Sequence, residues 1–86
     1  MLIKEGFLII FDWKSGYASI KNQEGDFIGV GGDRKFYICP PVQEKPSKEA
    51  LKIFEQMSKL IAKLSGLDNI KPVELMGKSK IAYRFI

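Results

Sequence analysis

The stretch SKEALKIFEQMSKLIAKLSG, residues 47–66, decides the fold because it is the one long segment with a helical period. Its apolar residues recur at spacings of three and four, as on one stripe of an amphipathic helix. They are Ala50, Leu51, Ile53, Phe54, Met57, Leu60, Ile61 and Leu64. Ser47 suits the N-cap position, and Gly66 suits the position just past the helix C-terminus. The pattern predicts a helix of about 18 residues.

Four short segments with strand character precede this helix, at residues 2–11, 16–21, 27–30 and 35–39. The links between them are short and rich in turn residues, which favours an antiparallel meander. Pro40 and Pro41 end the fourth strand, because proline cannot donate to a sheet. Two more strands, at residues 73–76 and 81–86, flank Gly77 to Lys80 and predict a second hairpin.

The expected fold is therefore α+β, with the order ββββαββ. It consists of an antiparallel sheet formed by a four-strand meander, one amphipathic helix packed on one face, and a C-terminal β-hairpin that extends or covers the sheet. The first four strands and the helix resemble, in their order alone, those of PUR-type and whirly-type single-strand-binding modules. The C-terminal hairpin departs from that order.

Alternation along the strands predicts two different faces of the sheet. An aliphatic face would take the helix, and it carries Ala18, Ile20, Ile28, Val30, Phe36 and Ile38. The opposite face would carry Tyr17, Lys21, Phe27, Lys35 and Tyr37, with Trp13 at its edge. Two interpretations stay open for this second face. Either it is an exposed platform on which bases stack, or the C-terminal hairpin covers it and makes a second small core.

Length and composition predict one domain spanning residues 1–86, without a membrane-spanning segment. The single cysteine, Cys39, allows no internal disulfide, so a cytoplasmic setting is expected. The chain carries a net charge of +4, and the excess lies in its second half. Residues 1–44 hold five basic and six acidic side chains, whereas residues 45–86 hold nine basic and four acidic ones. This asymmetry indicates an acidic partner.

Lysines follow the side of the predicted helix away from its apolar stripe, at Lys48, Lys52, Lys59 and Lys63. Further basic residues in the tail, Lys71, Lys78, Lys80 and Arg84, would enlarge this surface if packing joined the two groups. The alternative is an ordinary solvated surface, since Glu55 precedes Lys59 by four residues and can pair with it.

Catalysis and metal binding have little support. The chain has no histidine, the usual general base near neutral pH and a common zinc ligand. Cys39 precedes two prolines at a strand end and suits packing better than nucleophilic attack. The glycine-rich residues 29–35 lead into a strand rather than a helix, so they do not match a phosphate-binding loop. We expect a non-enzymatic protein without a metal or cofactor.

The leading hypothesis is a small nucleic-acid-binding protein of low sequence specificity, which binds DNA or RNA through lysines and through aromatic stacking. The predicted binding residues are Lys48, Lys52, Lys59, Lys63, Lys78, Lys80, Arg84, Arg34, Lys35, Trp13, Tyr17 and Tyr37. The alternative is a protein-interaction module, such as a small inhibitor or adaptor from a phage or mobile element. It would use a strand edge or the turn residues Trp13 and Arg34 against an acidic protein surface. Homo-oligomerisation through a free strand edge fits either hypothesis.

Overall fold

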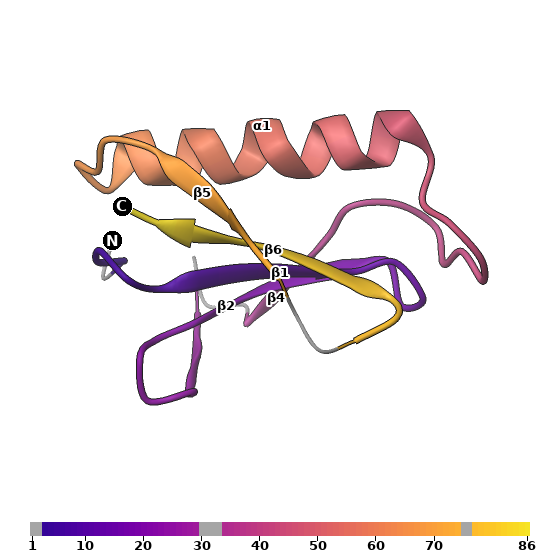
Figure 1. Ribbon diagram of the computed structural model, residues 1–86, viewed down its shortest axis with the longest axis horizontal. Coiled ribbons are helices and arrows are strands. Elements are labelled where there is room, and N and C mark those ends of the chain that lie inside the picture. Colours follow the sequence, from indigo (N-terminus) through magenta and orange to yellow (C-terminus); the bar gives the residue numbers. More distant parts are fainter. Residues whose placement is uncertain (1–2, 30–33, 75–76) are drawn as a thin grey trace.

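A six-stranded antiparallel sheet carries a long helix on one face (Figure 1). The structure is a computed structural model that describes residues 3–29, 34–74 and 77–86. The elements are β1 (Leu8–Asp12), β2 (Tyr17–Lys21), β3 (Phe27–Ile28), β4 (Lys35–Tyr37), α1 (Lys48–Leu64), β5 (Ile70–Val73) and β6 (Lys80–Phe85). The predicted α+β class and the order ββββαββ are confirmed. The predicted strand residue Val30 and the glycines before Asp33 lie outside the described residues.

The C-terminal hairpin extends the sheet. β6 pairs with β1 over the register Leu8 to Arg84 through Asp12 to Lys80, and β5 pairs with β6 at the edge. The sheet order is β3-β2-β1-β6-β5, so β1 is central, as its apolar residues on both faces predict. The interpretation in which the hairpin covers the second face is therefore wrong.

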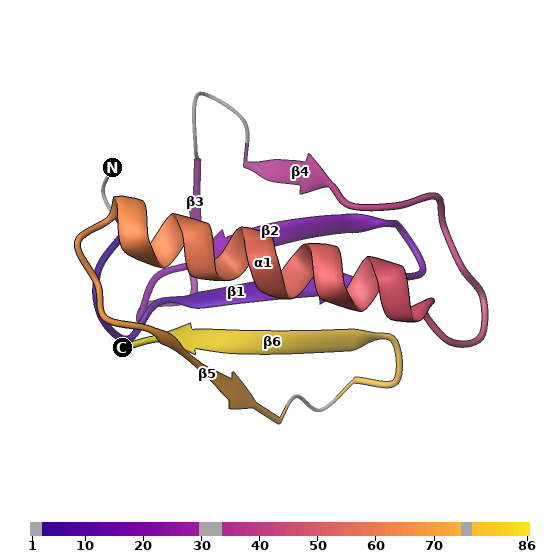
Figure 2. The ribbon, with the colours of Figure 1, turned by 90° about the horizontal axis from the view of Figure 1, so that it is seen from above.

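The meander differs from expectation at its last step, because β4 pairs with β2 rather than with β3. β3 occupies one end of the outer edge of β2, opposite Ile20 and Lys21, and β4 occupies the other end (Figure 2). The carbonyl of Gly16 accepts hydrogen bonds from the N–H groups of Ile38, at 2.8 Å, and Cys39, at 3.3 Å. These bonds tie the end of β4 to the β1–β2 turn.

Helix α1 begins and ends as its sequence predicts. The Ser47 hydroxyl accepts from the Ala50 N–H at 3.0 Å, which satisfies one of the free donors of the first turn. At the other end Gly66 has a φ of +75°. The N–H groups of Gly66 and Leu67 donate to the carbonyls of Lys63 and Ala62, at 3.1 and 2.9 Å. This pattern is the Schellman motif.

The core lies between α1 and the sheet. The ring of Phe54 sits 5.3 Å from that of Phe11 on β1 and 5.4 Å from that of Tyr83 on β6. The buried side of α1 differs in part from the predicted apolar stripe. It includes Ser58 and Ala62, which are fully buried and were not predicted to belong to the stripe. The Ser58 hydroxyl donates to the Phe54 carbonyl at 2.7 Å, so the buried hydroxyl has a hydrogen-bond partner.

Consequently, three residues of the predicted stripe, Ile53, Leu60 and Leu64, are exposed. Small side chains at the interface let the helix lie close to the sheet, and they occupy the buried side in place of bulkier ones.

The fifth strand was predicted at residues 73–76 but spans Ile70–Val73, and it includes Pro72, a residue that argues against a strand in the sequence. Leu75 and Met76 of the prediction lie outside the described residues. β5 is an edge strand, and proline fits an edge strand when its nitrogen faces away from the neighbouring strand. In the described part of the chain, no helix is long and apolar enough to cross a membrane.

Candidate nucleic-acid interface

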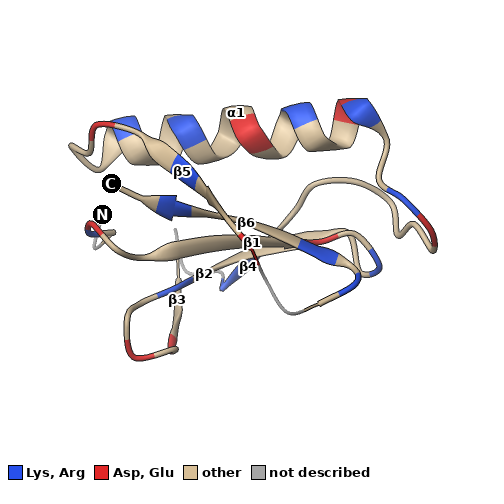
Figure 3. Ribbon diagram, in the orientation of Figure 1, with Lys and Arg blue, Asp and Glu red and all other residues tan. Residues whose placement is uncertain are grey.

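The side of the sheet opposite α1 is covered by no described element, and we call it the open face (Figures 1 and 3). The strand registers assign it three rows of side chains that cross the strands. From the β3–β4 edge towards β5, they are Tyr37, Tyr17, Asp12 and Lys80; then Lys35, Ser19, Ile10, Ala82 and Val73; then Phe27, Lys21, Leu8, Arg84 and Lys71.

Three aromatic side chains are exposed at one end of the open face. Tyr17 is 38% exposed, Phe27 is 49% exposed and Tyr37 is 55% exposed. The rings of Tyr17 and Tyr37 meet edge to face, with centroids 5.9 Å apart. Exposed rings on a sheet offer π-faces to the bases of a single strand.

A lysine lies over two of these rings. The Lys21 ammonium is 4.8 Å from the centroid of Phe27, and the Lys35 ammonium is 5.0 Å from that of Tyr17. Each contact holds a positive charge beside an aromatic surface, as cation–π attraction favours. A nucleotide needs the same pairing, because its base stacks while its phosphate is neutralised.

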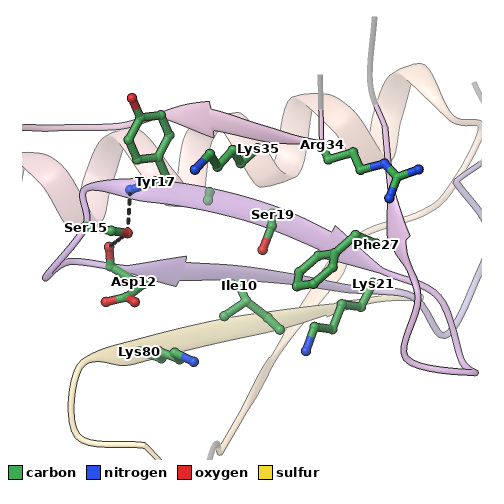
Figure 4. A pocket seen from close by; sticks show the side chains of 11 residues that line it. Ile10, Asp12, Ser15, Tyr17, Ser19, Lys21, Phe27, Arg34, Lys35 and Lys80 are labelled. Atoms are coloured by element: carbon green, nitrogen blue, oxygen red, sulfur yellow. Dashed lines mark hydrogen bonds between the residues drawn. The ribbon is translucent and has the colours of Figure 1, made fainter. Parts of the chain in front are cut away.

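A depression of about 690 Å³ lies between these aromatic residues and the rest of the open face (Figure 4). Its lining includes Tyr17 and Phe27, the apolar Ile10, the hydroxyls of Ser15 and Ser19, and the basic Lys21, Arg34, Lys35 and Lys80. The β2–β3 hairpin bends away from α1 (Figure 3). Phe27, at the start of β3, lines one side of the depression (Figure 4). This volume lies within the range of small-ligand sites.

Among the described residues, no basic side chain of the open face has a carboxylate within 4.0 Å, although Asp12 is the cross-strand neighbour of Lys80. Within residues 3–29, 34–74 and 77–86, the one ion pair joins Lys59 to Glu55 on α1, at 3.2 Å. Asp12 is the one carboxylate in the three rows, and its Oδ1 accepts from the Lys14 N–H at 3.0 Å. The open face therefore carries a net positive charge.

The helix lysines form a separate surface. Lys48, Lys52, Lys59 and Lys63 are exposed on α1. Lys80 and Arg84 belong by the strand register to the open face, on the other side of the sheet. The structure therefore does not join the helix and tail residues into one patch. The sequence left this point open, because a helix and a strand that share a basic composition can still face opposite ways.

Trp13 does not belong to the open face, because its indole packs against the core and its Nε1 is buried. Its backbone also holds two neighbouring segments, accepting from the Val42 N–H at 2.8 Å and donating to the Ser79 carbonyl at 3.0 Å. Of the other predicted residues, Tyr17, Tyr37, Arg34 and Lys35 gather around the aromatic end, and Lys78 lies in the turn before β6.

The predicted set of binding residues lacked Lys21, Phe27 and Lys71. Alternation had nevertheless placed Lys21 and Phe27 on the same face as Tyr17, and the strand register confirms this placement. The position of Lys71 required the strand pairing, since Pro72 concealed β5.

The chain's one cysteine and its acidic side chains have the chemistry of a nucleophile or a metal ligand. Burial raises the pKa of the Cys39 thiol above its usual 9.0, which keeps the sulfur protonated and weakly nucleophilic at neutral pH. The described parts of the chain contain no group of three or more Cys, Asp or Glu side chains that could hold a metal ion.

In comparisons with known proteins, no family model, curated protein or solved structure matches this chain.

Proposed function

We propose that the protein binds single-stranded nucleic acid with low sequence specificity, on the open face of its sheet. The bases stack on the exposed rings of Tyr17, Phe27 and Tyr37, and basic side chains neutralise the phosphates. Stacking favours a single strand over a duplex, because duplex bases already stack on each other. The proposal includes a non-enzymatic role and a cytoplasmic setting, in keeping with the absence of histidine and the single cysteine.

The observation that carries this proposal is the arrangement of lysines directly over exposed aromatic rings. Lys21 with Phe27 and Lys35 with Tyr17 make two such pairs on neighbouring strands. Neither lysine has a carboxylate within 4.0 Å among the described residues. Each pair therefore presents an aromatic ring and an uncompensated positive charge together, which are the two features that a stacked nucleotide requires.

The first experiment titrates a fluorescein-labelled 12-nucleotide single strand, and the matching duplex, with the protein at 50 and 200 mM salt. Anisotropy measures the fraction bound. We expect tighter binding of the single strand, and an affinity that falls roughly 10-fold or more between the two salt concentrations if about three phosphates are neutralised. Absence of binding at 50 mM salt would overturn the proposed function.

Two double variants then distinguish the two basic surfaces. Lys21→Glu with Lys35→Glu reverses charge on the open face, and Lys52→Glu with Lys63→Glu makes the same change in net charge on α1. We expect the first to abolish binding and the second to keep most of it. The reverse result would transfer the site to α1, as the sequence first suggested.

A protein-interaction module gains less support. Trp13, one of its two predicted anchors, packs against the core, and Pro72 lies in the edge strand β5. Proline at an edge opposes pairing with a further strand.

A further inference from the structure

Two positive side chains stand directly opposite each other at the far end of the open face from its aromatic residues. Lys71 on β5 is the cross-strand partner of Arg84 on β6. Directly opposed like charges destabilise a sheet, and an opposite-charge pair at the same positions would stabilise it. Both side chains are exposed, and neither has an ion-pair partner among the described residues.

This pair belongs to the same row as the aromatic site. The row runs from Phe27 through Lys21, Leu8 and Arg84 to Lys71, one residue for each strand. A smaller depression of about 300 Å³ borders Leu8 and Arg84 of this row and extends to Gly6, Asn22 and Gln23 beside it. Strands are spaced by about 4.8 Å, so Lys21 and Lys71 lie roughly 14 Å apart across the sheet.

We propose that Lys71 and Arg84 form a phosphate clamp, which holds the backbone of a single strand that crosses the sheet from the aromatic end to β5. This inference rests on the proposed function and adds the path of the ligand to it. A phosphate between the two cations removes their repulsion, which explains why an unfavourable pair occupies this edge. Arg84 offers a planar fork to two phosphate oxygens, and Lys71 adds a second charge.

The path also sets the number of nucleotides that the open face accommodates. A four-stranded RNA-binding sheet stacks two or three bases. Because this row crosses five strands, we expect a footprint of about three to five nucleotides.

The test exploits opposite effects on folding and on binding. Lys71→Glu converts the repulsive pair into an attractive one, so the melting temperature should rise by about 2 to 5 °C. The same variant should bind the labelled 12-nucleotide strand at least about 10-fold more weakly, since it places a negative charge against a phosphate. Lys45→Glu, in the exposed loop before α1, makes the same charge change away from the open face and should alter neither quantity strongly.

A second variant measures the phosphate interaction itself. Lys71→Gln should lower the slope of log affinity against log salt by about 0.7, the value expected when one phosphate of a single strand is no longer neutralised. If Lys71→Glu destabilises the protein, this slope carries the test alone.

If both Lys71 variants bind the labelled strand with the affinity of the wild-type protein, the clamp is overturned and the aromatic site stays in place. Failure of the wild-type protein to bind any strand at 50 mM salt would instead overturn the proposed function.

Discussion

At the scale of single residues, Gly16 helps β4, as well as β3, to pair with β2. Its φ of +84° is unfavourable for any residue with a Cβ, and its carbonyl holds the end of β4. A methyl group at this position would also collide with the carbonyl oxygen of Cys39. Gly25 has a similar φ, of +88°, but a methyl group there meets no atom within 4 Å. Gly25 is therefore required only for its backbone conformation, whereas Gly16 is required both for its conformation and for the space that a Cβ would fill.

We predict that Gly25→Ala lowers the free energy of unfolding by about 1 to 2 kcal/mol, the usual cost of a left-handed alanine. Gly16→Ala should lower it by about 1 to 3 kcal/mol more, because of the additional collision. Urea denaturation followed by Trp13 fluorescence measures both changes. Equal losses in the two variants would show that β4 moves aside without cost.

At the scale of elements, the sequence predicted what depends on local chemistry. Ser47 and Gly66 identified the helix ends, and alternation from Tyr17 to Lys21 identified the faces of β2. It did not predict what depends on partners distant in the chain. The return of β4 to β2 and the position of the hairpin beside β1 are set by packing, as is the exposure of Leu64.

Phe54 and Leu64 test how α1 is turned towards the sheet. Both belong to the predicted apolar stripe, but Phe54 is fully buried and Leu64 is 63% exposed. We expect Phe54→Ala to cost about 3 to 5 kcal/mol of stability and Leu64→Ala to change it by less than about 1 kcal/mol. Comparable losses, measured by urea denaturation, would mean that Leu64 has a buried partner.

At the scale of the whole molecule, two basic surfaces face opposite directions across one thin core. α1 presents its lysines on one side, and the open face presents Lys21, Lys35, Lys71, Lys80 and Arg84 on the other. A single short strand cannot bind both surfaces at once. The total charge of +4 is therefore a poor guide to the site, and the open face is distinguished by its aromatic residues.

Binding should be insensitive to pH near neutrality. The chain has no histidine, and the raised pKa of Cys39 keeps its thiol neutral. Histidine is the side chain whose ordinary pKa lies between about pH 5.5 and 7, and phosphodiesters keep their charge in this range. We predict an affinity for the labelled strand that changes by less than about twofold across this range at fixed salt. A steep change would reveal a titrating group in the site.

The pairing of β1 with β6 has a consequence for protein synthesis. The strand that emerges early from the ribosome needs, as its neighbour, a strand made about 70 residues later along the chain. Phe85 and Tyr83, which complete the core beneath α1, arrive with that late strand. Until residues 80–85 have left the exit tunnel, β1 has an unpaired edge and the open face lacks Lys80 and Arg84. The surface that we propose to bind nucleic acid is therefore complete only after synthesis has passed this point.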